Sequence, residues 1–138
     1  MSKINNLLEE LKLLELPEDS YVIVGSGPLG IRNIREVKDL DILVNDNLWN
    51  KLASKYGIIS KDGNKVIKVS DDIEVLGNET FPSSLLDDPS VEDQIVSAEL
   101  INGHPFQSIS HFQYFKKMGK RQKDLDDIKL LQDWVDSR

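Results

Sequence analysis

The stretch that decides the fold is residues 21–44, which read YVIVGSGPLGIRNIREVKDLDILV. An apolar run leads into Gly25-Ser26-Gly27, and a second apolar run begins with Asp39 and Asp41. Residues two apart on a strand point to the same face, with Cα atoms about 7 Å apart, so these two carboxylates are expected to converge. Because two acids on one face repel each other unless a cation lies between them, the pattern predicts a site for a hard divalent cation.

The short segment between the two runs predicts a place for phosphate. Gly25 and Gly27 allow a turn without side-chain bulk, so backbone N–H groups and the Ser26 hydroxyl can approach phosphate oxygens. Pro28 suits the first turn of a following helix. A Gly-Ser-Gly turn alone is more often an ordinary tight turn, and the acid pair downstream is what favours a nucleoside triphosphate with its metal.

Two parts of the chain resemble one superfamily. Residues 21–44 resemble the core of the nucleotidyltransferases, the superfamily of DNA polymerase beta and the antibiotic nucleotidyltransferases, in which Gly-Ser precedes a short helix and Asp-x-Asp opens the next strand. Residues 35–41, REVKDLD, resemble the Arg-x-Thr-x-Asp-x-Asp run of one branch, with Val37 in place of the Thr. Residues 98–128 resemble the tail of small bacterial nucleotidyltransferase-like proteins, which ends in Arg-x-Lys-Asp-x-x-Asp-Ile.

This resemblance implies an α+β fold: a small mixed β-sheet with helices packed mainly on one face, in a single minimal domain over residues 1–138. It also implies a third carboxylate on a later strand. Glu74 in the apolar segment IEVL is the preferred candidate, because alternation places it opposite Ile73 and Val75 and so toward the cleft. Asp72 has the same parity and stays open as a substitute.

The resemblance further implies transfer of a nucleoside monophosphate, with AMP expected, from a triphosphate to an acceptor hydroxyl, with pyrophosphate leaving. Asp39, Asp41 and Glu74 would hold two Mg²⁺ ions, and Glu74 is also a candidate general base. Gly25 and Ser26 would seat the β- and γ-phosphates. The candidates for offsetting triphosphate charge are Lys116, Arg121 and Lys123, with Arg35 and Lys38 as alternatives.

Plainer interpretations compete with these roles. A basic run at a helix end is by default solvated and complements the helix dipole. For Asp124 and Asp127, salt bridges that lock helices together are the preferred interpretation. The departure at Val37 leaves room for a catalytically weak member that serves as a nucleotide-binding or protein-interaction module.

Composition limits the partners. The 138 residues are 39% apolar, enough for one core, and 17 basic against 24 acidic residues give a net charge of -7. This charge argues against a salt-driven grip on long nucleic acid, so the expected acceptor is a small molecule, a protein or an RNA end. The absence of cysteine excludes thiolate metal sites. No signal peptide or membrane span is recognised, so a cytoplasmic protein is expected, and a second copy of the chain is a candidate partner that would complete the substrate pocket as a homodimer.

Periodicity and turn residues predict the remaining elements. Helices are expected over residues 3–15 and 46–56, from a capping box at Ser110 and Gln113, and near the C-terminus. Strands are expected over residues 20–24, 39–44, 66–69 and 73–76, and Asn102-Gly103 predicts a hairpin.

Overall fold

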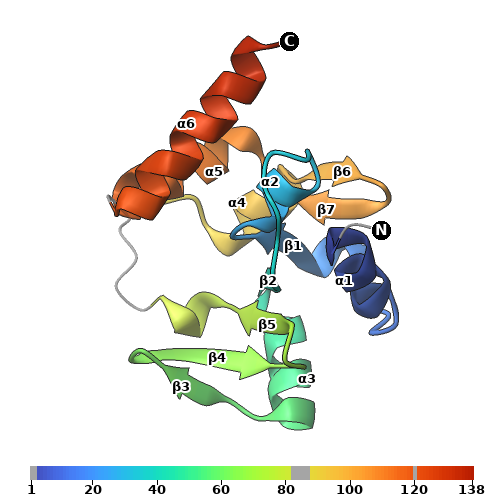
Figure 1. Ribbon diagram of the computed structural model, residues 1–138. Coiled ribbons are helices and arrows are strands. Elements are labelled where there is room, and N and C mark those ends of the chain that lie inside the picture. The colour runs from blue at the N-terminus through green and yellow to red at the C-terminus, as the bar shows by residue number, and fades with distance from the viewer. Residues whose placement is uncertain (1–2, 82–87, 120) are drawn as a thin grey trace.

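The computed structural model describes residues 3–81, 88–119 and 121–138. Its described residues form a seven-stranded mixed sheet with the strand order β3-β4-β5-β2-β1-β7-β6 (Figure 1). The strands are β1 (Tyr21–Val24), β2 (Leu40–Val44), β3 (Ile59–Lys61), β4 (Asn64–Lys68), β5 (Ile73–Leu76), β6 (Glu99–Ile101) and β7 (His104–Phe106). The α-helices are α1 (Lys3–Lys12), α2 (Gly27–Gly30), α3 (Asp46–Tyr56), α4 (Val91–Val96), α5 (Ile109–Gly119) and α6 (Gln122–Asp136). The α+β class and the mixed sheet predicted from the sequence are confirmed.

The centre of the sheet combines antiparallel and parallel neighbours. β2 pairs antiparallel with β1 and parallel with β5, so the second apolar run lies between the first one and the IEVL strand. Ile23, Ile42 and Val75 are fully buried on one face. Strands buried on both faces read as continuous apolar runs, as β1 does, and this explains why alternation is weak there.

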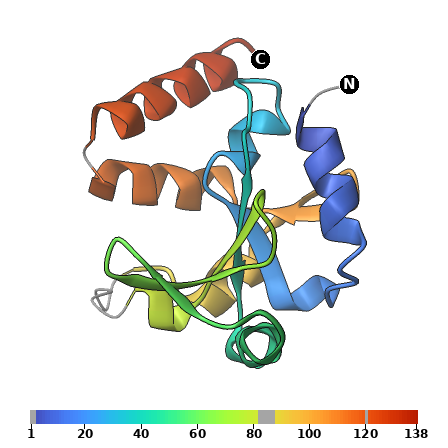
Figure 2. The same ribbon diagram turned by 60° about the horizontal axis from the view of Figure 1, so that its bottom comes forward.

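Helices cover the two faces unequally. α1 and α3 pack on the face of Ile23 and Ile42, and they contribute Leu7, Leu11 and Trp49 to the main core. The six-residue α4 lies on the other face, where Val91 joins Val22, Val24 and Leu43. α5 and α6 lie side by side and pack on Leu29 of α2 through Phe112 and Leu131 (Figure 2).

Several predicted boundaries are confirmed and others shift. α3 and β5 have the predicted limits, and the Asn102-Gly103 hairpin forms with both residues at positive φ. The predicted helix over residues 3–15 ends at Lys12. The capping box at Ser110 was wrong: α5 begins at Ile109, and Ser108 caps it, accepting a hydrogen bond from the backbone N–H of His111 at 3.2 Å.

One strand, β3, was not predicted from the sequence. β3 pairs with β4 through a two-residue turn, Asp62-Gly63, in which both residues have positive φ (52° and 84°). Ile59 in β3 is 45% exposed, so the segment has no buried apolar run from which a strand could be predicted. No helix in the described part of the chain is long and apolar enough to cross a bilayer.

Candidate functional site

The fold brings the three predicted acids to one face of the sheet. Asp41 on β2 and Glu74 on β5 are paired neighbours in the parallel ladder, so their side chains point the same way. Asp39 lies just before β2 and has the same parity as Asp41. This is the face that carries Val22, Val24 and Leu43, opposite the face covered by α1 and α3.

The charges of Asp39 and Glu74 act on Asp41. The pKa of Asp41 is raised to about 6, first by burial and then by the charges of Asp39 and Glu74. Lys61 and Lys123 act in the opposite direction on the same carboxyl. The acids therefore form one electrostatic group, and two lysines from distant parts of the sequence lie within reach of it.

The glycine turn lies directly against Asp41. Gly25 follows Val24, the paired neighbour of Asp41, and has a φ of 67°. A Cβ on Gly25 would lie 2.7 Å from Oδ2 of Asp41, so only glycine allows this approach. Ser26 is half-buried, and its side chain makes no capping hydrogen bond to the one-turn helix α2 that follows. The predicted phosphate turn and the predicted metal ligands are thus neighbours.

Glu74 has a partner that the sequence did not reveal. The ammonium of Lys61, at the end of β3, donates a hydrogen bond to Oε2 of Glu74 at 2.9 Å. The described residues contain no group of three or more Asp, Glu, His or Cys side chains that could hold a metal ion. Asp62-Gly63 is a strong hairpin signal, from which the position of Lys61 at the end of a strand could have been predicted.

Asp72 is directed elsewhere. Its backbone carbonyl accepts a hydrogen bond from Leu40 at 2.8 Å, and its carboxylate lies 3.9 Å from the ammonium of Lys3 on α1. Since α1 covers the opposite face of the sheet, the geometry favours Glu74 as the third carboxylate.

Most of the predicted phosphate-binding cations are held by two other acids. Asp124 and Asp127 on α6 are each only 2% exposed. Lys116 lies 2.9 Å from Asp127 and 3.4 Å from Asp124. Arg35 lies 3.3 Å from Asp127, and Arg121 lies 3.0 Å from Asp124. The expectation that Asp124 and Asp127 lock helices together by salt bridges is confirmed.

The remaining two predicted cations differ in position. Both Lys38 and Lys123 are exposed, and no ion pair of either is found within the described residues. Lys123 lies in the first turn of α6 and lowers the pKa of Asp41 by its charge. Of the predicted basic residues, Lys123 is therefore the one placed to offset charge at the acids.

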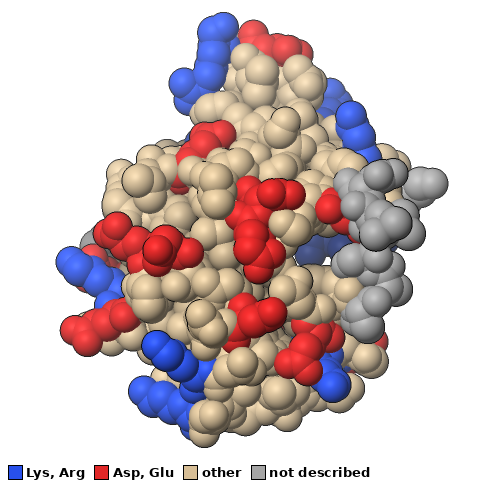
Figure 3. Space-filling view, turned by 180° about the vertical axis from the view of Figure 1, so that it is seen from behind, with Lys and Arg blue, Asp and Glu red and all other residues tan. Residues whose placement is uncertain are grey.

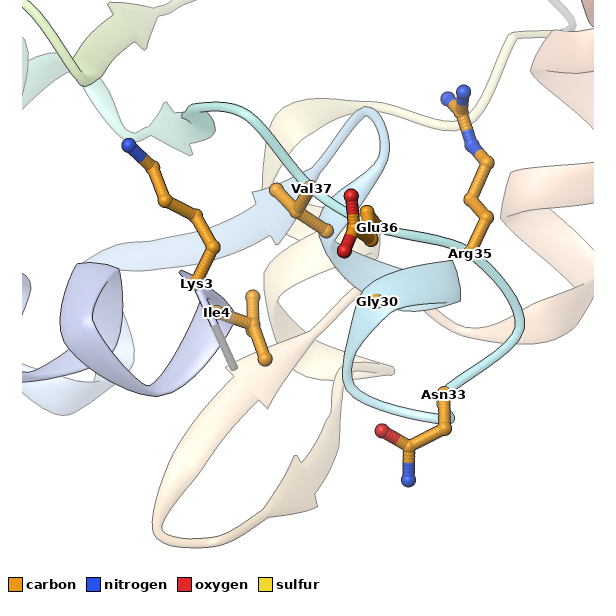
Figure 4. A pocket seen from close by; sticks show the side chains of 7 residues that line it. All are labelled: Lys3, Ile4, Gly30, Asn33, Arg35, Glu36 and Val37. Carbon is orange, nitrogen blue, oxygen red and sulfur yellow. The ribbon is translucent and has the colours of Figure 1, made fainter. Parts of the chain in front are cut away.

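A cavity of about 260 Å³ lies beside the loop between α2 and β2 (Figure 4). Lys3 and Arg35 extend from different sides of it, and Arg35 turns toward the Asp127 ion pair. None of Asp39, Asp41 and Glu74 lines this cavity. This cavity is therefore separate from the candidate acid site.

Surface charge agrees with the composition. Figure 3 shows acidic side chains spread across the middle of one face, with basic side chains mainly toward its periphery. Among the described residues, this face carries no continuous basic stripe of the kind that follows a nucleic-acid backbone.

Comparisons with known proteins identify the fold. Neither a protein-family model nor a curated protein sequence matches the chain. Among solved structures, it is similar to TM1012 of Thermotoga maritima, a candidate nucleotidyltransferase, with a TM-score of 0.58 and 16% identity over 100% of this chain and 97% of that one. An antigenic nucleotidyltransferase-like protein of Paracoccidioides brasiliensis matches with a TM-score of 0.47 and 17% identity over 92% of this chain and 71% of that one. The chain has a nucleotidyltransferase-like fold.

Proposed function

We propose that the protein is a metal-dependent nucleotidyltransferase that moves a nucleoside monophosphate, with AMP expected, from a triphosphate to an acceptor hydroxyl and releases pyrophosphate. One observation carries this proposal. Asp39, Asp41 and Glu74 form a single charged group on one sheet face, directly beside the Gly25 turn.

The donor set suits Mg²⁺. Carboxylate oxygens are the ligands that hard cations prefer, and Asp39, Asp41 and Glu74 supply them from adjacent strands. The pKa of Asp41 is raised first by burial and then by the charges of Asp39 and Glu74, and Lys61 and Lys123 offset this rise only in part. When bound, Mg²⁺ supplies charge neutralisation at the phosphates and lowers the pKa of the attacking hydroxyl.

The protein groups then have separate roles. The backbone at Gly25 and the hydroxyl of Ser26 bind and orient the phosphates, because the turn leaves them free of side-chain bulk. Lys123 neutralises part of the triphosphate charge from the start of α6. Glu74 accepts the proton of the acceptor hydroxyl, since a carboxylate beside the reacting oxygen can act as general base.

A second candidate is favoured by a different observation. Glu74 is already bonded to Lys61, and Arg35, Lys116 and Arg121 are occupied by Asp124 and Asp127. A protein with these groups neutralised internally fits a catalytically weak module that binds nucleotide or a partner protein. The two candidates differ in whether nucleotide binding requires metal.

Thermal-shift titrations distinguish them. We expect ATP, and more weakly other nucleoside triphosphates, to raise the melting temperature only with Mg²⁺, and we expect the Asp39→Asn/Asp41→Asn variant to lose this rise. A metal-independent rise in both proteins supports the binding module. No shift with any triphosphate at millimolar concentration contradicts nucleotide binding and leaves the protein-interaction role.

For the acceptor we propose a class only: a small molecule, a protein or an RNA end. We also propose that the protein acts in the cytoplasm. A homodimer is proposed as the means of completing the acceptor pocket, because none of Asp39, Asp41 and Glu74 lines the cavity found among the described residues. Size-exclusion chromatography with light scattering, with and without nucleotide, tests that proposal.

A further inference from the structure

We propose that Lys61 is a built-in counter-ion of the acid site, which holds Glu74 when no metal is bound and competes with the metal for that carboxylate. This inference rests on the proposed function, because it concerns the metal affinity of the same site. It assigns a role to a residue outside the glycine turn, the Asp-x-Asp pair and the C-terminal basic run.

The geometry of the pair suits an exchangeable contact. Lys61 Nζ lies 2.9 Å from Glu74 Oε2, within direct hydrogen-bond range. The Lys61 side chain is 58% exposed, whereas that of Glu74 is 18% exposed. The carboxylate is therefore recessed in the sheet face, and the ammonium reaches it from the solvent side. An exposed lysine can swing away without disturbing the core.

Strand register fixes Lys61 on the acid face. Lys61 pairs with Asn64 across the β3–β4 turn, and Lys68, which has the parity of Asn64, pairs with Glu74. Side chains of paired residues share a face, so Lys61 and Glu74 point the same way. Lys65 has the other parity and lies near Glu79, at 3.7 Å. Lys68 shares this face by register, but no ion pair of Lys68 is found among the described residues, so Lys61 is the hairpin lysine bonded to an acid of the site and Lys65 lies outside it.

Lys61 acts on the whole acid group. Its pKa is raised, first by the hydrogen bond with Glu74, then by the charges of Glu74, Asp41 and Asp39. An ion pair with so exposed a partner contributes little stability, whereas a dication interacts with each carboxylate about twice as strongly as an ammonium at equal distance. A metal can therefore displace Lys61, and Lys61 lowers the apparent metal affinity by occupying Glu74.

Direct metal binding tests the inference without an assay of catalysis. Free Mn²⁺, measured by electron paramagnetic resonance, is titrated against wild type, Lys61→Met, Lys61→Arg and Lys65→Met. We expect Lys61→Met to lower the Mn²⁺ Kd by about threefold to tenfold, the scale of a weak ion pair plus the lost cation repulsion. Lys61→Arg keeps the charge and should stay within twofold of wild type, as should Lys65→Met, the control on the opposite face.

Asp41→Asn is titrated in parallel, to separate this inference from the proposed function. If Asp41→Asn loses Mn²⁺ while Lys61→Met binds it no more tightly than wild type, the role of Lys61 is overturned and the metal site stands. If none of the proteins binds Mn²⁺, both the metal site and the role of Lys61 are overturned. Equal tightening in Lys61→Met and Lys65→Met also overturns it, because general hairpin charge would then be the cause.

Discussion

Two groups of acids in this molecule differ in the charges that surround them. Asp124 and Asp127 are almost fully buried, yet Lys116, Arg35 and Arg121 surround them, and the pKa of Asp124 is lowered, mainly by its hydrogen bond from the Arg121 side chain. Asp41 is partly buried beside Asp39 and Glu74, and its pKa is raised to about 6, first by burial and then by the charges of these two acids. The same residue type is thus stabilised as a carboxylate at one place and destabilised at the other.

The difference separates structural acids from candidate functional ones. Paired buried acids fix the packing of α5 and α6 and the loop that carries Arg35. Gathered like charges cost stability, and proteins concentrate such strain where a ligand relieves it. The four predictions that follow test this contrast, from the largest expected effect to the smallest.

Asp127→Asn should destabilise the protein most. The substitution leaves Lys116 and Arg35 facing a neutral side chain in a site that is 2% exposed. Breaking a buried ion pair from one side costs about 3 to 4 kcal/mol in the free energy of unfolding. Urea denaturation measures it, and a loss below about 1 kcal/mol contradicts a structural role.

Asp41→Asn should stabilise the folded protein. Removing the charge ends the cost of burying it and relieves the repulsion from Asp39 and Glu74, and a pKa near 6 against an ordinary 3.8 sets an upper limit of about 3 kcal/mol at neutral pH. Thermal unfolding at pH 7.5 tests it, with the exposed Asp71→Asn as a control of unchanged stability. A destabilised Asp41→Asn contradicts the idea of uncompensated charge.

The pH dependence of this gain has a definite sign. Between pH 4 and 6 the folded state keeps a proton on Asp41 that the unfolded state has released, so raising the pH lowers the wild-type stability. The advantage of Asp41→Asn should therefore open between pH 4 and 6 and vanish below pH 4. Asp124 has the opposite sign, because its lowered pKa makes its contribution disappear only on acidification below 3.8.

Gly25→Ala should cost about 1 to 2 kcal/mol and disturb the acid site. The added Cβ meets both a φ of 67° and the Asp41 carboxylate at 2.7 Å. Gly63→Ala is the matched control, because Gly63 has a φ of 84° but no neighbour within 4 Å. Urea denaturation of both variants separates backbone strain from the contact. Equal losses would show that closeness to Asp41 contributes nothing.

Asp133→Asn should have the smallest effect, below about 0.5 kcal/mol. Its pair with Lys129 at 3.3 Å is the i,i+4 type, and both side chains are more than half exposed. Compared with Asp127→Asn on the same helix, Asp133→Asn measures the stability that is lost when an ion pair exposed to water is removed. A cost as large as that of Asp127→Asn would remove the contrast between buried and exposed pairs.

The sequence predicted the elements whose signals are local. The helix over residues 46–56 has an Asn45 cap and a Gly57 stop, and IEVL is a short apolar run, so both limits were correct. β3 was missed because its side chains are exposed, and its position depends on pairing with β4. Ser108 and not Ser110 caps α5, because the helix begins at Ile109 and the hydroxyl of Ser108 accepts the hydrogen bond from the backbone N–H of His111.

For the site, parity within single strands was enough to place Asp41 and Glu74 on one face once β2 and β5 proved to be neighbours, and Asp39 lies in the bend just before β2, where its charge acts on Asp41. Their roles as metal ligands stay a prediction. The sequence alone could not predict which basic side chains pair with which acids. Which of Lys116, Lys123 and Lys61 faces the acids depends on tertiary distances, and only the fold assigns Lys116 to Asp124 and Asp127.

The central claim is that the acids on β2 and β5 bind a nucleotide through metal, and calorimetric titration of ATP tests it most directly. Wild type should bind ATP with Mg²⁺ and not with EDTA, while Asp41→Asn, although more stable, should bind in neither condition. Equal ATP affinity in wild type and Asp41→Asn, with or without Mg²⁺, would contradict the claim and place nucleotide binding outside these acids.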